Sequence, residues 1–227
     1  MQLTIAHRIA HRIAHRIAGA FTLAAMTLAA MTLAAMTLAT PSALRAADGS
    51  ACKVQAYATC NDADLSGADL SNAKLRASQL ERANLDAANL TSSDLQGAYL
   101  TDASLAKADL TGANLRGATL LRADLTGAVL SQTTLADARM DGAVLRDADA
   151  REANFEGAQL QEVDFRGADL RGAVFVGATL AGADLRGANL EDAVLDGGAW
   201  QPGANLMGAT WTDGTVCGRG SMGRCAD

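Results

Sequence analysis

Histidine is the side chain best suited to acid-base catalysis near neutral pH, and this chain has three, His7, His11 and His15. Each is followed by an arginine, and the basic segment that they form precedes 28 consecutive uncharged residues, 17–44. A basic start, a long apolar stretch and a small residue at a cleavage position, here Ala46, are typical of an export signal. Its removal would leave a chain without histidine and so without the usual general base.

The uncharged stretch is longer than the core of most signal peptides, so an uncleaved membrane anchor is the alternative interpretation. With residues 1–46 read as a cleaved signal, we expect a periplasmic or extracellular protein that has no membrane contact. This segment holds four of the 19 basic residues and none of the 25 acidic ones, so the remaining chain has a net charge of −10. That charge argues against a nucleic-acid partner.

Other motifs that could support chemistry are weak. The string nearest to a Gly-x-Ser-x-Gly nucleophile motif is Gly220-Ser221-Met222-Gly223, which is more typical of a loop. No phosphate-binding Gly-rich motif is present, and no cysteine and histidine pair has the spacing of metal ligands. We therefore expect no catalytic residue, no cofactor and no metal, and we do not expect an enzyme.

The rest of the chain has a period of five residues. Residues 61–200 divide into 28 pentads without a break, and a leucine such as Leu65 or Leu70 ends nearly every one. The residue two before the leucine is usually alanine, and one extra residue near Pro202 shifts the phase. The leucine position is occupied by another residue in six pentads, at Met140, Ala150, Phe155, Phe165, Phe175 and Trp200.

A period of five fits neither an α-helix nor the alternation of a flat strand, but it fits a solenoid in which each pentad forms one side of a coil. Leucine and alanine would then point inward, and the frequent glycine before the alanine suits a corner. Ala150 is small for its layer, because its neighbours in the column are Leu130 and Leu170. We expect the side chain of Phe155 to lean across and fill that space.

The pentads resemble those of the pentapeptide-repeat proteins, whose consensus A(D/N)LXX is matched by Ala63-Asp64-Leu65-Ser66-Gly67 and by Ala113-Asn114-Leu115-Arg116-Gly117. The flanking segments are similar to those of exported bacterial members. The resemblance implies an all-β fold, a right-handed quadrilateral β-helix with four pentads per coil. On that basis we expect about seven coils and a stack of roughly 34 Å. The expected organisation is a signal in residues 1–46, an N-terminal cap in 47–60, the β-helix in 61–211 and a C-terminal cap in 212–227.

Four cysteines, Cys52, Cys60, Cys217 and Cys225, allow three pairings. On the stack that the resemblance implies, the two ends lie too far apart for a disulfide, so we expect Cys52 with Cys60 and Cys217 with Cys225. Export makes oxidation plausible, and the two bridges would act as end caps.

A 20-residue coil places arginines in columns that form a candidate interaction surface. Arg146, Arg166 and Arg186 would stack on one face, and Arg151 and Arg171 on the next. Aspartates run beside both columns, at Asp164 and Asp184 and at Asp149 and Asp169. We expect a solvated ladder of ion pairs that binds neither anionic polysaccharide nor DNA at about 0.15 M salt, where the Debye length is about 8 Å.

These observations favour a non-enzymatic, exported solenoid that serves as a structural or protein-interaction element with an unknown partner. One alternative is a DNA-mimic inhibitor of topoisomerase (gyrase), because some family members resemble duplex DNA in charge. A stack of this length would need about 20 net negative charges to match a duplex, whereas residues 61–200 have 22 acidic and 12 basic residues. A membrane-anchored envelope scaffold is the other alternative.

Overall fold

The computed structural model describes residues 52–195, 203–222 and 225. The chain divides into two compact units, Met1–Ser42 and Ala43–Asp227, and all described residues belong to the second. The predicted export signal, Trp200 and Pro202 lie outside the described residues. Within the described ranges the backbone forms no helix and no extended strand, and it is built from β-turns and isolated β-bridges.

Each pentad ends in a β-turn that forms a corner of the coil. In a representative turn the N–H of Ala68 donates to the carbonyl of Leu65 at 3.1 Å, and Gly67 between them has φ +62°. A positive φ at the third residue marks a type II turn, in which glycine is the least strained residue. The predicted corner role of glycine is confirmed here, yet many corners carry another residue, such as Ala77 with φ 50°.

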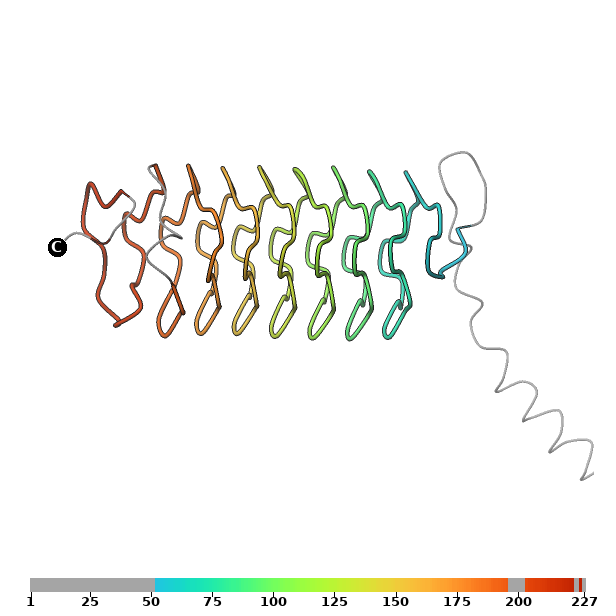
Figure 1. Ribbon diagram of the computed structural model, residues 1–227, viewed down its shortest axis with the longest axis horizontal. Coiled ribbons are helices and arrows are strands. Elements are labelled where there is room, and N and C mark those ends of the chain that lie inside the picture. The colour runs from blue at the N-terminus through green and yellow to red at the C-terminus, as the bar shows by residue number, and fades with distance from the viewer. Residues whose placement is uncertain (1–51, 196–202, 223–224, 226–227) are drawn as a thin grey trace, which may run out of the picture. The chain divides into compact units, whose positions relative to one another are not determined.

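Successive coils are joined by main-chain hydrogen bonds between residues about 20 apart. The N–H groups of Leu65 and Gly67 donate to the carbonyls of Asn84 and Asp86 in the next coil, at 2.7 and 2.8 Å. In return, the N–H of Asn84 donates to the carbonyl of Ala63 at 2.8 Å. Parallel bridges between residues 20 apart recur along the stack, so four pentads make one coil (Figure 1).

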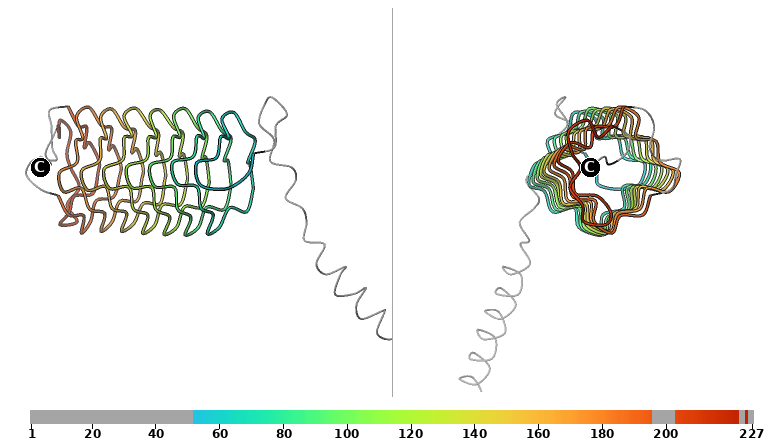
Figure 2. Two further views of the ribbon diagram at one scale, coloured as in Figure 1. Left: turned by 45° about the vertical axis from the view of Figure 1, so that its right-hand side comes forward. Right: turned by 90° about the vertical axis from the view of Figure 1, so that its left-hand side faces the viewer.

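The coils superpose along the stack and give it a four-sided outline (Figure 2). We name the faces by their columns of bridged residues. Face A has the column Asp64, Asn84, Ser104, Asp124, Val144, Asp164, Asp184 and Asn205. Face B has Asp69, Asn89, Asp109, Val129, Asp149, Asp169, Asn189 and Thr210. Face C has Lys74, Asp94, Asn114, Thr134, Asn154, Val174 and Val194. Face D has Thr59, Gln79, Tyr99, Thr119, Arg139, Gln159 and Thr179.

The interior is made of the leucine and alanine positions, as the sequence predicts. Leu80 through Leu190 and the alanines two before them are almost all fully buried. Polar residues replace alanine at a few buried positions, and two of them find main-chain acceptors. Ser78 donates to the carbonyl of Gln55 at 3.1 Å, and Thr133 donates to that of Leu110 at 2.7 Å. Such bonds remove the cost of burying a hydroxyl group.

Three phenylalanines form an aromatic cluster in the later coils. Phe155 and Phe175 stack with ring centroids 5.0 Å apart, and Phe165 meets them edge-on at 6.0 and 6.4 Å. All three are fully buried, and so is Ala150. Large aromatic side chains are therefore concentrated in the coils around Ala150, the smallest residue at a leucine position. Whether Phe155 fills the space beside Ala150 stays a prediction.

The extra residue near Pro202 is absorbed without loss of register. The bridges Asp184 to Asn205 and Asn189 to Thr210 span 21 residues, whereas those before them span 20. Leu206 is fully buried in the shifted coil. The phase shift predicted from the sequence is therefore confirmed.

The terminal segments are held by disulfides and antiparallel bridges. The structure pairs Cys52 with Cys60 and Cys217 with Cys225, with Cα atoms 5.1 and 4.9 Å apart, which is the pairing favoured by the sequence. After the last parallel bridges the chain turns back, so that Val216 bridges Thr210 and Met222 bridges Asn205 in antiparallel orientation.

Candidate functional site

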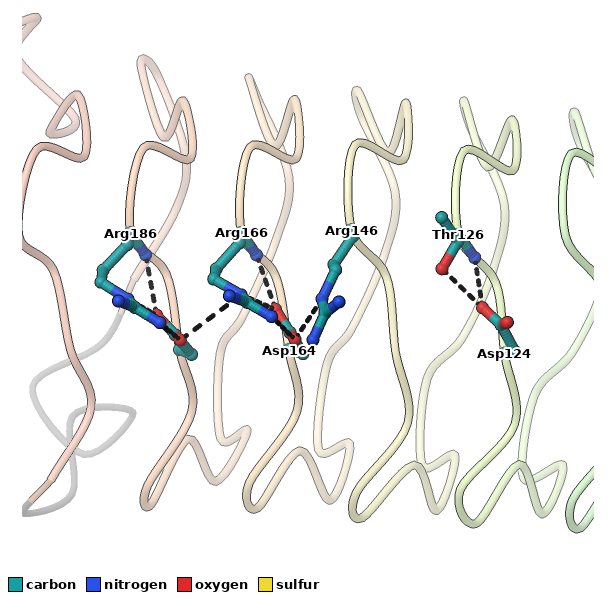
Figure 3. Close-up of polar contacts among 7 residues, drawn as sticks. Asp124, Thr126, Arg146, Asp164, Arg166 and Arg186 are labelled. Carbon is teal, nitrogen blue, oxygen red and sulfur yellow. Dashed lines mark hydrogen bonds and ion pairs between the residues drawn. The ribbon is translucent and has the colours of Figure 1, made fainter.

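Aspartate in a bridge column organises the turn that follows it. On face A, Asp124 Oδ1 accepts hydrogen bonds from the N–H of Thr126 at 2.9 Å and from its hydroxyl at 2.6 Å (Figure 3). That N–H belongs to the second residue of the turn, and it has no main-chain acceptor among the described residues. A short acidic or amide side chain two residues earlier satisfies it, which explains the Asp or Asn of the repeat.

The same aspartate position also binds arginine. Arg166 donates its Nε and a terminal nitrogen to the two oxygens of Asp164 at 2.9 and 2.8 Å, and Arg186 makes the same contacts with Asp184 at 2.8 and 2.6 Å. The N–H groups of both arginines also donate to these carboxylates. Each Asp-x-Arg clamp therefore combines a turn with a bidentate ion pair.

Arg146 departs from this pattern because valine precedes it. Val144 offers no carboxylate, so Arg146 Nε donates to Asp164 in the next coil at 2.6 Å (Figure 3). Arg166 also lies 3.6 Å from Asp184. The three predicted arginines of face A are thus joined by two aspartates into one continuous chain of ion pairs.

Face B repeats the clamp with two pairs. Arg151 binds Asp149 with both contacts at 2.7 Å, and Arg171 binds Asp169 at 2.8 and 2.6 Å. Arg151 lies 3.9 Å from Asp169 in the next coil. All five arginines predicted from the sequence therefore lie on the two expected faces, and each is paired.

The clamps shift the acidities of the aspartates. Hydrogen bonds from the Arg166 guanidinium lower the pKa of Asp164 to about 2, partial burial opposes this shift, and Arg146 adds to it. The pKa values of Asp149, Asp169 and Asp184 are also lowered, in each case chiefly by the arginine of the same clamp. These carboxylates are charged at every physiological pH, so none can serve as a proton donor.

In the clamps the charges of arginine and aspartate neutralise each other. Both oxygens of each clamp carboxylate accept hydrogen bonds from a guanidinium group, so few lone pairs remain to bind a metal cation. Among the described residues no group of three or more acidic, cysteine or histidine side chains is placed to hold a metal ion. The same part of the chain contains no helix long and apolar enough to cross a membrane.

The repeat itself decides the family. The family model described as pentapeptide repeats matches residues 57–91, 83–121, 93–132, 130–167 and 158–197, which together span more than half of the chain. The chain is a pentapeptide repeat protein. Membership of this family implies that the stacked coils form a right-handed β-helix.

Several solved structures are similar to this pentapeptide repeat protein. HetL, involved in heterocyst differentiation regulation in the cyanobacterium Nostoc, is 30% identical over 67% of this chain and 86% of its own, with a TM-score of 0.39. QnrB1, a plasmid-mediated fluoroquinolone resistance protein, is 25% identical over 59% and 78%, with a TM-score of 0.45. A thylakoid-lumen pentapeptide repeat protein of Arabidopsis thaliana is 29% identical over 56% and 83%, with a TM-score of 0.29. No curated protein matches the sequence.

This pentapeptide repeat protein also has a charged column that the sequence analysis missed. At the corner between faces D and A, Arg82 pairs with Asp62 at 2.6 and 2.7 Å, and Arg122 pairs with Asp102 at 2.8 and 2.7 Å. All four residues have the same position in successive coils. The 20-residue register would have revealed the alternation of charge, had it been applied to corner residues as well as to those beside the bridges.

Proposed function

We propose that this protein is an exported, non-enzymatic β-solenoid that acts as a rigid structural or protein-interaction element. A fold of about seven coils, continuous from the first bridge to the last, would present four long faces of fixed geometry. The proposal rests on the packing of the interior and on the ion pairs of the surface. The described interior is filled mainly by apolar side chains, and the carboxylates of the clamps, such as those of Asp164 and Asp184, are neutralised by arginine from the same chain.

The terminal disulfides support the exported location. Each bridge would close a short loop and contribute on the order of 2 to 3 kcal/mol, provided that the protein folds in an oxidising compartment. Coils at the end of a solenoid present main-chain edges that could template association, so we assign the two bridges the role of end caps. Peptide mapping under non-reducing conditions should recover Cys52 with Cys60 and Cys217 with Cys225. A link from Cys52 to Cys217 would contradict the stacked geometry.

The proposal is tested by location and by partner capture. We expect the protein in the envelope or medium fraction of its cell, and we expect crosslinking there to retain a protein partner that is not recovered from cells lacking this protein. Recovery in the cytosol, together with inhibition of gyrase supercoiling, would instead support a DNA mimic. Release only by detergent, with the N-terminal segment intact, would support a membrane-anchored scaffold.

A further inference from the structure

Five of the seven exposed large apolar residues of the described chain lie at the two ends of the stack. Tyr57 lies in the first corner and is 76% exposed. The other four lie at the opposite end (Figure 1), in the last coils and the C-terminal cap, and they are Val194, Met207, Val216 and Met222. Exposed apolar side chains that gather in one place favour contact with another molecule, so the ends are better candidate interfaces than the four faces.

Main-chain groups at the N-terminal end of faces A and B are open. Asp64 and Asp69 begin these two columns, and their N–H and carbonyl groups have no partner within the described chain. One coil later the same groups are paired, since the N–H of Asn84 donates to Ala63 and its carbonyl accepts from Leu65. The N-terminal cap therefore leaves two edge positions that can pair with another chain.

The C-terminal end of face B is open as well. Val216 bridges Thr210 in antiparallel orientation, and the hydrogen bonds of this bridge are made by the residues on either side of Val216. The N–H and carbonyl of Val216 itself point away from the stack and have no partner among the described residues. Asp69 at one end and Val216 at the other are thus open edges of the same face.

The two ends are stepped in complementary ways. At the C-terminal end face C stops at Val194, whereas face B continues for two further positions to Val216. At the N-terminal end Thr59 of face D precedes Asp64 of face A, and Tyr57 lies at the corner before it. A second molecule added in register would bring its Tyr57 to the side on which face C of the first ends early.

The N-terminal end is acidic on one side and basic on the other. Asp64 and Asp69 accept hydrogen bonds only from neutral donors, so no cation balances their charge. On face C, Lys74 is exposed and makes no ion pair within the described chain, and Arg76 at the next corner lies 3.9 Å from Asp94.

The C-terminal end has the opposite arrangement. Arg219 lies at the corner between faces A and B, because the residues before and after it bridge faces B and A. It is exposed and makes no ion pair in the described part of the chain. Glu191, Asp192 and Asp213 are exposed at the corner between faces B and C, where Asp192 N–H donates to the turn that contains Asp213.

We propose that the C-terminal end of one molecule docks on the N-terminal end of a second copy, with the four faces in register. Arg219 then lies above the corner that Asp64 and Asp69 flank, and the acidic corner lies on the side of Lys74 and Arg76. Val216 continues face B of the neighbouring molecule through the open main-chain groups of its Asp69. This inference rests on the proposed function and names a second copy of the chain as a partner.

The remaining charges at the ends do not oppose this contact. Asp62 is bound by Arg82 and Asp184 by Arg186, while exposed Lys53 adds positive charge to the N-terminal end. The protein is acidic overall, but at about 0.15 M salt the Debye length is about 8 Å, so charges far from the ends are largely screened.

The contact should be weak and directional. The disulfide caps cover part of each end, so the docking surface is small and a single contact holds two copies loosely. Because the two docking surfaces differ, the contact does not close, and copies add one after another along a single axis. Association should therefore grow with protein concentration and weaken with added salt.

The test is sedimentation velocity of the disulfide-bonded protein purified from its cell. We expect the mean mass to rise steadily with concentration and to show no plateau at the dimer. Arg219→Asp at one end and Asp69→Arg at the other should each weaken association about fivefold or more. An equimolar mixture of the two variants should regain wild-type association, because exchanged charges face each other at one contact and native charges at the next.

Matched control variants lie in the middle of the stack. Asp109→Arg changes an aspartate of the same column that accepts the N–H of Thr111, as Asp69 accepts that of Ser71. Arg139→Asp changes an exposed arginine that has no ion pair in the described chain. Each control should change association by less than about twofold.

Three results would overturn the inference. The first is a mass that stays at the monomer at every concentration. The second is a dimer plateau that Arg219→Asp lowers and Asp69→Arg leaves unchanged, which would indicate a two-fold contact between C-terminal ends. The third is a mixture of the two variants that associates no better than either variant alone.

The same measurements separate this inference from the proposed function. If the protein stays monomeric and crosslinking in the envelope retains a different protein, the inference fails and the proposed function stands. If the protein associates end to end but is recovered from the cytosol, export is wrong and the head-to-tail contact stands.

Discussion

The coils between residues 57 and 107 and those between residues 142 and 192 share one backbone register but are built from different side chains. Glycine fills two of the eleven corners in the first region and seven of the eleven in the second. The first region has an interior of leucine, alanine and serine, and the second contains the phenylalanine cluster. Arginine pairs between corners of successive coils in the first region, and within Asp-x-Arg clamps in the second.

The difference teaches that the main-chain hydrogen bonds between coils, rather than any one side chain, define the fold. Ala77 adopts a left-handed conformation that alanine disfavours, because its N–H is held by the carbonyl of Gln96 in the next coil at 2.9 Å. The second region meets the same constraint with glycine and so carries less backbone strain. We therefore expect the later coils to be the more stable part of the solenoid.

The largest effect should come from truncating the aromatic cluster. Phe165→Ala removes an interior ring together with its edge contacts to two others, and should lower the free energy of unfolding by about 3 to 5 kcal/mol. Leu85→Ala is the matched variant in the same interior column of the first region and should cost about 2 to 3 kcal/mol. Equilibrium denaturation measures both. An effect of Phe165→Ala no larger than that of Leu85→Ala would contradict the proposed contribution of the rings.

Enlarging the small interior residue of the second region should also destabilise the protein. Ala150→Leu should overpack its layer, if the neighbouring ring of Phe155 fills it, and should cost about 1 to 3 kcal/mol. Thermal unfolding of the variant decides this. A higher melting temperature would show instead that the layer contains an empty site.

The clamps of the second region should make its stability depend on acid pH. The pKa of Asp164 is about 2 in the folded protein and near 3.8 when unperturbed, so the carboxylate stabilises the folded state fully above about pH 4. As the pH falls from about 4 to about 2, the unfolded chain takes up the proton first and this contribution, about 1 to 2 kcal/mol, is lost.

The pH dependence is measured by comparing Asp164→Asn with wild type in denaturant titrations at pH 6 and pH 2. The variant should be less stable at pH 6 and nearly equal at pH 2. Asp124→Asn is the control, because Asp124 binds a hydroxyl rather than guanidinium. A stability difference for Asp164→Asn that does not change with pH would rule out the ion pairs as its cause.

The smallest effects should come from exchanging corner residues between the two regions. Gly187→Ala introduces a Cβ that meets nothing within 4 Å, so its cost is backbone strain alone, about 1 kcal/mol. Ala77→Gly should stabilise the first region by about 0.5 to 1 kcal/mol for the same reason. Hydrogen exchange in the affected coils detects both changes. Opposite signs would show that corner strain does not distinguish the two regions.

Much of the fold could be predicted from the sequence because a five-residue period leaves few structures open. The inward alanine and leucine positions, the phase shift before Asn205 and the stacking of Arg146, Arg166 and Arg186 all follow from counting residues. The positive φ of Ala77 could not be predicted, since it is imposed by hydrogen bonds to a neighbouring coil and opposes local preference. The pairing of Arg146 with Asp164 also depends on a neighbour, because Val144 lacks a carboxylate.

The hydrogen bonds between coils give the stack a net dipole along its axis. In each pentad two N–H groups, such as those of Leu65 and Gly67, point toward the C-terminal end, and one, such as that of Asn84, points back. The unbalanced peptide dipoles add along the axis and leave the C-terminal side of every coil richer in donors and the N-terminal side richer in acceptors. Two stacks of such coils without end caps would therefore be complementary when placed head to tail and would repel when placed head to head.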